Sequence, residues 1–93
     1  MKKYEAYVTC LGAGKRMFVR KTDGDYQLFC RVDNFTREVP IDYHEAIRLL
    51  MRTNSIFSNL NYYRNFRLSL RMIDNAIDDC EYHEEEANEQ SIP

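Results

Sequence analysis

Cysteine and histidine are the residues of this chain whose spacing could support metal chemistry. Cys80 and His83 are three residues apart, so on a helix they would share a face and could clasp a zinc ion together. A structural zinc site needs two further ligands, and Cys10, Cys30 and His44 are the remaining candidates. In a meander of four strands, the strand that contains Met17 would lie between those of Cys10 and Cys30. The two cysteines would then be two strand spacings apart, too far for one ion or for a disulfide bond. The sequence therefore predicts no metal site and no cofactor, with the thiols as small core side chains or one exposed near the C-terminal end.

No catalytic or phosphate-binding pattern is complete. Residues 12–15 read GAGK, which lacks the spacing of a phosphate-binding loop and precedes a strand rather than a helix. His44 is followed by Ser55 and Ser58, but no elbow motif surrounds either serine. Glu84–Glu86 fall in an expected mobile tail, a poor place to tune a general acid. We therefore expect a binding protein and not an enzyme.

The stretch KRMFVRKTDGDYQLFCRV, residues 15–32, carries side chains that suggest binding. It alternates with period two and contains Asp23-Gly24, a pair that favours a type I′ hairpin turn. A two-residue turn there pairs Phe18 with Phe29 on the face that a half-buried hairpin leaves to polar residues. The outward patch expected from this hairpin and the preceding strand consists of Tyr7, Arg16, Phe18, Arg20, Phe29 and Arg31.

Three interpretations of this patch stay open. Aromatic rings stack on unpaired bases while guanidinium groups bind phosphate, as in single-stranded nucleic-acid binding. The same residue types are enriched at protein interfaces. Aromatic cross-strand pairs also stabilise a sheet without any partner. Arg16 and Arg31 are expected opposite each other, where they repel unless an anionic group lies between them.

Alternating residues predict four strands within the first forty-one positions. A first loop at residues 12–15 would place Thr9 opposite Phe18 and Tyr7 opposite Arg20. The expected inward residues are Tyr4, Ala6, Val8 and Cys10, then Met17 and Val19, then Tyr26, Leu28, Cys30 and Val32, and, after a weaker turn at Asp33-Asn34, Phe35, Arg37, Val39 and Ile41.

Helical periodicity replaces the alternation after Pro40, which makes the fourth strand an edge strand because proline has no N–H to donate. Asp42 and Glu45 have the spacing of a capping box, and the first helix is expected to end at Asn54. A second helix is expected over residues 61–83. Its core-facing stripe is expected to consist of Phe66, Leu70, Ile73, Ile77 and Cys80.

These elements predict an α+β fold, a four-stranded antiparallel meander followed by two helices packed on one sheet face (ββββαα). Residues 1–83 are expected to form a single domain and residues 84–93 an acidic, frayed tail. An apolar fraction of 44% and an aromatic fraction of 13% are those of a folded chain rather than a disordered one.

The second helix has a further candidate surface opposite its expected core stripe. Arg64, Arg67 and Arg71 cluster there, and Leu68 and Met72 lie beside them. Exposed leucine and methionine at this spacing suggest a docked helix, either from a second copy in a homodimer or from a partner. The alternative is that the bridging segment SIFSNL covers them.

Charge is unevenly distributed along the chain. Residues 78–89 contain seven acidic and no basic residues, whereas the rest has thirteen basic against eight acidic residues, a net charge of +5. Acids in the last turns of a helix oppose its dipole. Asp78, Asp79 and Glu81 are therefore candidates for binding a basic groove on a partner or for covering the chain's own arginines. The plain alternative is a solvated helix end that aids solubility.

The sequence also predicts a cytoplasmic protein that does not bind membranes. The basic start MKKYEAYVTC is not followed by the apolar segment of a signal peptide. No apolar run approaches the roughly 20 residues of a membrane helix. Three cysteines, an odd number, fit reduced thiols better than a disulfide framework.

The favoured function is a small non-catalytic protein-interaction module. We expect an inhibitor or adaptor of the phage or mobile-element type, which binds a host protein or complex through the aromatic-arginine face and the acidic helix end. Compact single domains without cofactor motifs are common among such regulators. The alternative is a single-stranded nucleic-acid-binding protein that uses the same face, with the acidic tail as electrostatic competitor.

Overall fold

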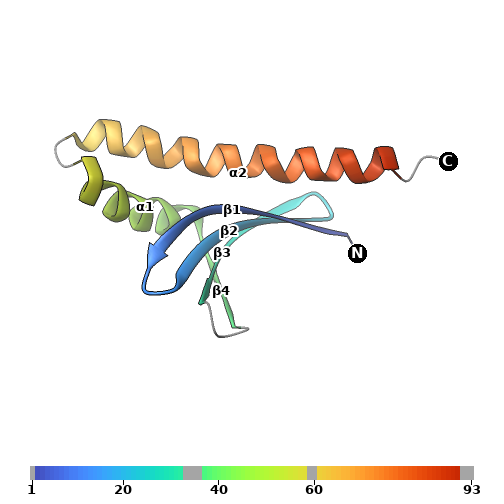
Figure 1. Ribbon diagram of the computed structural model, residues 1–93, viewed down its shortest axis with the longest axis horizontal. Coiled ribbons are helices and arrows are strands. Elements are labelled where there is room, and N and C mark those ends of the chain that lie inside the picture. The colour runs from blue at the N-terminus through green and yellow to red at the C-terminus, as the bar shows by residue number, and fades with distance from the viewer. Residues whose placement is uncertain (1, 33–36, 59–60, 91–93) are drawn as a thin grey trace.

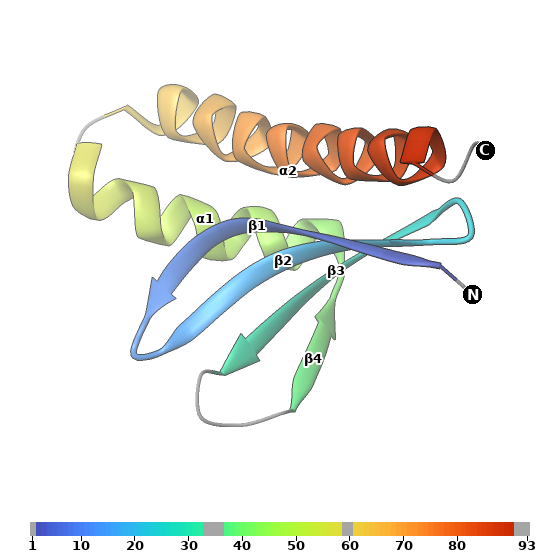
Figure 2. The same ribbon diagram turned by 45° about the vertical axis from the view of Figure 1, so that its right-hand side comes forward.

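The computed structural model describes residues 2–32, 37–58 and 61–90, and it confirms the predicted ββββαα layout (Figure 1). Four antiparallel strands form one open sheet in the order β1-β2-β3-β4. Both helices lie on one face of the sheet, which we call the inner face, and the opposite face is the outer face (Figure 2). The elements are β1 (Lys3–Gly12), β2 (Lys15–Thr22), β3 (Asp25–Val32), β4 (Glu38–Ile41), α1 (Tyr43–Ser58) and α2 (Tyr62–Gln90).

Two tight turns with left-handed backbone connect the first three strands. Asp23 and Gly24 have φ angles of 50° and 90° and form the predicted turn between β2 and β3. The predicted register follows, with Phe18 opposite Phe29. The first connection is also a two-residue turn, at Ala13-Gly14, where φ is 51° and 72°. β4 is an edge strand, as Pro40 predicts.

The register of β1 differs from the prediction. Two irregularities near its end shift the pairing, so that Tyr7 lies opposite Phe18 and Glu5 opposite Arg20. The predicted pairing of Thr9 with Phe18 is therefore wrong, as is that of Tyr7 with Arg20. The two shifts together move the pairing by an even number of residues, so Tyr7 still lies on the outer face.

The hydrophobic core lies between the inner face and the helices. Met17 and Val19 of β2 are buried beneath α2. Small residues let this helix approach the strands closely, since the Cys80 Sγ atom lies 3.6 Å from the carbonyl oxygens of Tyr4 and Val19. The buried core residues are Ala6, Met17, Val19, Leu28, Ala46, Leu50, Ile73, Ala76 and Cys80.

The buried stripe of α2 is rotated relative to the prediction because α1 packs against one side of it. Asn65 and Ser69 are buried there, and the Asn54 amide donates to Ser69 Oγ at 2.9 Å. Met72, predicted to face away from the core, is half-buried, and its sulfur accepts a contact of 3.6 Å from the same amide. That prediction is wrong. Phe66 belongs to the predicted stripe but is only half-buried, as is Leu70.

Both helices extend beyond their predicted ends. The Asp42 carboxylate caps α1 as predicted, accepting the Glu45 N–H at 2.7 Å. α1 continues past Asn54, and α2 continues past residue 83, to the bounds given above. The predicted turn at residues 33–34 and the strand position of Phe35 lie outside the described residues. In the part of the chain that is described, neither helix is long and apolar enough to cross a membrane.

The C-terminal half of α2 lies beside the β2–β3 hairpin (Figures 1 and 2). The Tyr26 hydroxyl donates to Glu81, and the Lys21 ammonium lies 3.4 Å from the Glu84 carboxylate. The hydrogen bond to Glu81 and burial raise the pKa of Tyr26 above its usual value. Part of the acidic helix end therefore contacts the body of the protein, through a lysine and a tyrosine rather than through the arginines.

Candidate functional site

The outer face of the sheet brings the predicted aromatic residues into one row. Tyr7, Phe18 and Phe29 come from three neighbouring strands and lie opposite one another in the register. The Phe18 and Phe29 rings stack with centroids 5.5 Å apart, and Tyr7 meets Phe18 edge-on at 5.8 Å. The sequence thus located this cluster correctly, although it misplaced the partner of Tyr7.

Two of the predicted arginines cover these rings. The Arg20 guanidinium lies over Phe29 with its carbon 4.3 Å from the ring centroid, and the Arg31 guanidinium lies 4.9 Å from the centroid of Phe18. As a result Phe29 is only 1% exposed although no helix covers this face, and Phe18 is half-buried. Arg16 is exposed and lies opposite Arg31 in the register, as predicted.

Two carboxylates that the sequence reasoning missed complete the cluster. Glu38 Oε1 accepts hydrogen bonds from Arg20 at 2.7 Å and from Arg31 at 2.6 Å. Glu5 accepts from the same two residues, at 2.9 Å from Arg20 Nε and at 3.3 Å from Arg31. The chain itself therefore supplies anionic partners for Arg31 and Arg20, whereas the sequence predicted an anionic group between Arg31 and Arg16. We refer to Glu5, Tyr7, Phe18, Arg20, Phe29, Arg31 and Glu38 as the outer patch.

A period-two count contains the missed signal. Glu5 stands two residues before Tyr7 on β1, so the two side chains share a face. Glu38 stands two residues before Pro40, which pairs with Phe29 on β3. Both glutamates were therefore assignable to the outer face once the register was known, but the short fourth strand gave no firm register from the sequence.

The ion pairs dominate the electrostatics of the outer patch. Hydrogen bonds from Arg20 and then Arg31 lower the pKa of Glu38 from 4.5 to about 2. The hydrogen bond to Glu38 raises the pKa of Arg31, and hydrogen bonds to Glu38 and Glu5 raise that of Arg20. Two guanidinium groups face two carboxylates, so the patch carries no net charge of its own at neutral pH. Tyr7, which is 51% exposed, is the most accessible aromatic side chain of the outer patch.

The candidates on α2 do not join the outer patch, because they lie on the layer at the other side of the sheet (Figure 1). Tyr63, Arg64, Arg67, Leu68 and Arg71 line a shallow groove on the exposed side of the helix. The predicted acidic candidates Asp78, Asp79 and Glu81 are exposed about two to three turns further along the same helix.

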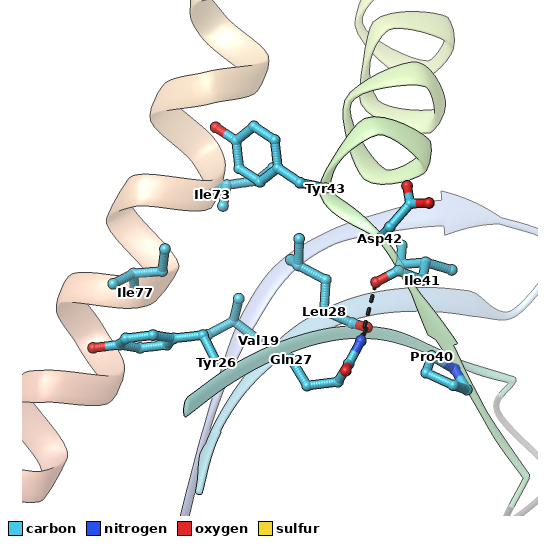
Figure 3. Close-up of a pocket in the computed structure, with 10 residues that line it drawn as sticks. All are labelled: Val19, Tyr26, Gln27, Leu28, Pro40, Ile41, Asp42, Tyr43, Ile73 and Ile77. Carbon is cyan, nitrogen blue, oxygen red and sulfur yellow. Dashed lines mark hydrogen bonds between the residues drawn. The ribbon is translucent and has the colours of Figure 1, made fainter. Parts of the chain in front are cut away.

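A cleft of about 510 Å³ opens between β3, β4 and the two helices (Figure 3). In its lining, Gln27 Nε2 donates to the Ile41 carbonyl at 3.0 Å (Figure 3) and to the Leu28 carbonyl at 2.7 Å. Asp42 is the one carboxylate of the lining, and it caps α1. The lining residues are Val19, Tyr26, Gln27, Leu28, Pro40, Ile41, Asp42, Tyr43, Ile73 and Ile77. This mainly apolar lining pairs no nucleophile with a base.

The cysteines lie apart from one another; the position of Cys10 corrects its predicted inward orientation, and that of Cys80 confirms its place in the predicted core stripe. Cys10 is exposed and lies opposite Arg16, because the shifted register turns it out of the core. Cys80, the thiol nearest the acidic end, is fully buried, and burial, reinforced by Asp79, raises its pKa to about 11. Among the described residues, no three cysteine, histidine or acidic side chains gather as metal ligands.

Comparison of the chain with family models, with curated proteins and with solved structures finds no match.

Proposed function

We propose that the protein is a small non-catalytic interaction module that binds a protein partner through the outer patch. The observation that carries the proposal is the pairing of both patch arginines with Glu5 and Glu38. It leaves a preorganised surface whose charges are already balanced, with Tyr7 exposed beside the half-buried Phe18. Exposed tyrosine beside arginine and phenylalanine is the residue combination enriched at protein interfaces.

The same pairing weighs against the nucleic-acid alternative. A phosphate group would have to displace Glu5 or Glu38 from the guanidinium groups, and any carboxylate left nearby would repel it. Phe29 is too deeply buried to stack on a base, which leaves Tyr7 and the half-buried Phe18. The charge balance and the burial both favour a protein partner.

In this proposal the chain acts as an inhibitor or adaptor of the phage or mobile-element type, which occupies a surface of a host protein. Such a role requires a stable small scaffold and a preorganised contact surface, because a rigid patch loses little conformational freedom on binding. The stacked rings and the four-residue ion-pair network provide that rigidity. Tyr7 is the expected central contact.

The proposal is tested by affinity capture from a lysate of the host, with and without nuclease treatment. The bait is the wild-type chain, the Tyr7→Ala variant or the control variant Tyr62→Ala, which removes an even more exposed tyrosine from α2. We expect one stoichiometric partner that survives nuclease, is retained by Tyr62→Ala and is lost with Tyr7→Ala. Partners that disappear with nuclease, or a partner indifferent to Tyr7→Ala, would contradict the proposal.

A further inference from the structure

A stripe of charged side chains runs along the exposed side of α2. The stripe advances by three or four residues at each step, as required for side chains that stay on one helix face. All of its members are exposed: Arg64, Arg67, Arg71, Asp74, Asp78, Glu81 and Glu85. The three residues nearest the N-terminal end of the helix are basic, and the four that follow are acidic.

This stripe lies opposite the side of α2 that packs on the protein. Ser69, Ile73, Ala76 and Cys80 face the sheet and α1, about half a turn away from the stripe. Figure 1 shows no other helix or strand of the described residues on the exposed side of α2. Within the described residues, Arg67 contacts the Tyr63 ring, Glu81 accepts a hydrogen bond from Tyr26, and Asp74 interacts electrostatically with Tyr43. The Arg64 N–H donates to the Asn61 side chain.

We propose that this stripe is the contact surface of a homodimer in which two α2 helices pack antiparallel. A two-fold axis between Met72 and Ile73 places Arg71 of one copy opposite Asp74 of the other. The same axis places Arg67 opposite Asp78 and Arg64 opposite Glu81. Every basic residue of the stripe then meets an acidic one, and symmetry forms each pair twice.

The order of the charges selects both the orientation and the partner. In a parallel pair arginine would face arginine and aspartate would face aspartate, which is repulsive along the whole stripe. A second copy is complementary to this surface by its own sequence, so no separate partner with a matching charge order is required. Apolar area beside the stripe comes from the exposed parts of Tyr63, Leu68 and Tyr82.

The inference goes beyond the proposed function and does not depend on it. The stripe and the outer patch lie on opposite layers, so a dimer through α2 leaves both outer patches free and makes the assembly bivalent. Because exposed ion pairs are individually weak and screened by salt, the dimer is expected to be reversible and sensitive to ionic strength.

Sedimentation velocity of the full chain over a range of concentrations tests the dimer. At about 0.01 M ionic strength, where the screening length is about 30 Å, we expect concentration-dependent dimerisation. At about 1 M, where it is about 3 Å, we expect monomer. Monomer at every concentration in low salt would overturn the proposal.

Charge reversal tests the pairing itself. Arg67→Asp or Asp78→Arg turns two symmetry-related attractions into repulsions and should weaken dimerisation about thirtyfold. The double variant Arg67→Asp/Asp78→Arg in one chain should restore it, because the pair is rebuilt with its charges exchanged. Arg48→Asp changes the net charge of the chain equally on an exposed site of α1 and should have no effect.

Three results of this experiment would overturn the proposal. The first is a dimer that ignores both single reversals, since it would use another surface. The second is failure of the double variant to recover when each single variant weakens association, since the two positions would then not face each other. The third is an effect of Arg48→Asp as large as that of Arg67→Asp, since net charge would then explain the loss. Circular dichroism confirms that each variant is folded.

Discussion

The inner and outer faces of the sheet each hold a side chain with almost no exposed surface, and they exclude water by different means. Met17 on the inner face is 0% exposed beneath a helical layer. Phe29 on the outer face is 1% exposed beneath the side chains of its own sheet, chiefly Arg20 and Arg31. The inner face is thus closed by a second layer of structure and the outer face by long charged side chains.

This difference has consequences for stability. The core contacts of the inner face are apolar, so their contribution to stability depends on side-chain volume and hardly on salt or mild acid. The cover of the outer face consists of arginines held by Glu5 and Glu38, so it depends on the charge state of those groups. Substitutions on the two faces should therefore differ in their dependence on salt and pH.

The largest effect is expected from Phe29→Ala. If the arginine cover makes the outer face a second small core, the substitution should lower the free energy of unfolding by about 3–5 kcal/mol, the usual range for a buried phenylalanine. Urea unfolding of wild type and variant measures it. A loss below about 1 kcal/mol would mean that Phe29 behaves as a surface residue and that the two faces are not comparable.

On the inner face, Cys80→Leu should destabilise by about 1–3 kcal/mol through overpacking. The Cys80 sulfur already lies 3.6 Å from two strand carbonyl oxygens, so a larger side chain must push α2 away from the sheet. The loss should be the same in low and high salt. A salt-dependent loss in urea unfolding would show that charged contacts, such as that of Lys21 with Glu84, also hold this helix.

Arg20→Met keeps much of the apolar cover of Phe29 but removes the ion pairs of Arg20. It should lower the free energy of unfolding by about 1–2 kcal/mol at low salt. The cost should shrink at high salt, in contrast to that of Cys80→Leu. Arg48→Met, on the exposed side of α1, is the matched control and should change stability by less than about 0.5 kcal/mol. Equal effects of the two substitutions would show that Arg20 does not help to shield Phe29 from water.

The smallest effect is expected in the pH dependence. The folded pKa of Glu38, about 2, lies below its ordinary value of 4.5, so the unfolded chain binds the proton more readily between these values. The stabilisation is complete above pH 4.5 and is lost as the pH falls towards 2. As the pH falls from 4.5 towards 2, the midpoint temperature of thermal unfolding should therefore drop more steeply for wild type than for Glu38→Gln. Parallel curves would show that the Glu38 ion pairs do not stabilise the fold.

Much of the fold could be predicted because local signals agree with it. Asp23-Gly24 fixed the register of the β2–β3 hairpin, and with it the Phe18–Phe29 pair, since a two-residue turn leaves one alignment. Asp42 correctly marked the start of α1. Element order and the edge position of β4 followed from alternation and from Pro40.

The remaining features depend on tertiary contacts. The first irregularity of β1, between Tyr7 and Thr9, has no glycine to mark it, and Gly12 at the second was assigned to the loop, so the partner of Tyr7 was misassigned. Asn65 and Ser69 are polar and did not count as core, which hid the rotation of α2 towards α1 and misplaced Met72. Periodicity assigns Glu38 to the outer face, but its place opposite Arg31 depends on the register of the four-residue β4, which the sequence does not give.

The central claim is that the arginines of the outer patch are committed to Glu5 and Glu38 and are not available to phosphate. Fluorescence anisotropy of a labelled single-stranded oligonucleotide, titrated with the protein at about 0.15 M ionic strength, tests it directly. We expect no saturable binding by wild type, and a gain of binding by the variant Glu5→Gln/Glu38→Gln, which frees the guanidinium groups. Saturable binding by wild type that falls steeply with salt and is weakened by Phe18→Ala would contradict the claim and assign the patch to nucleic acid.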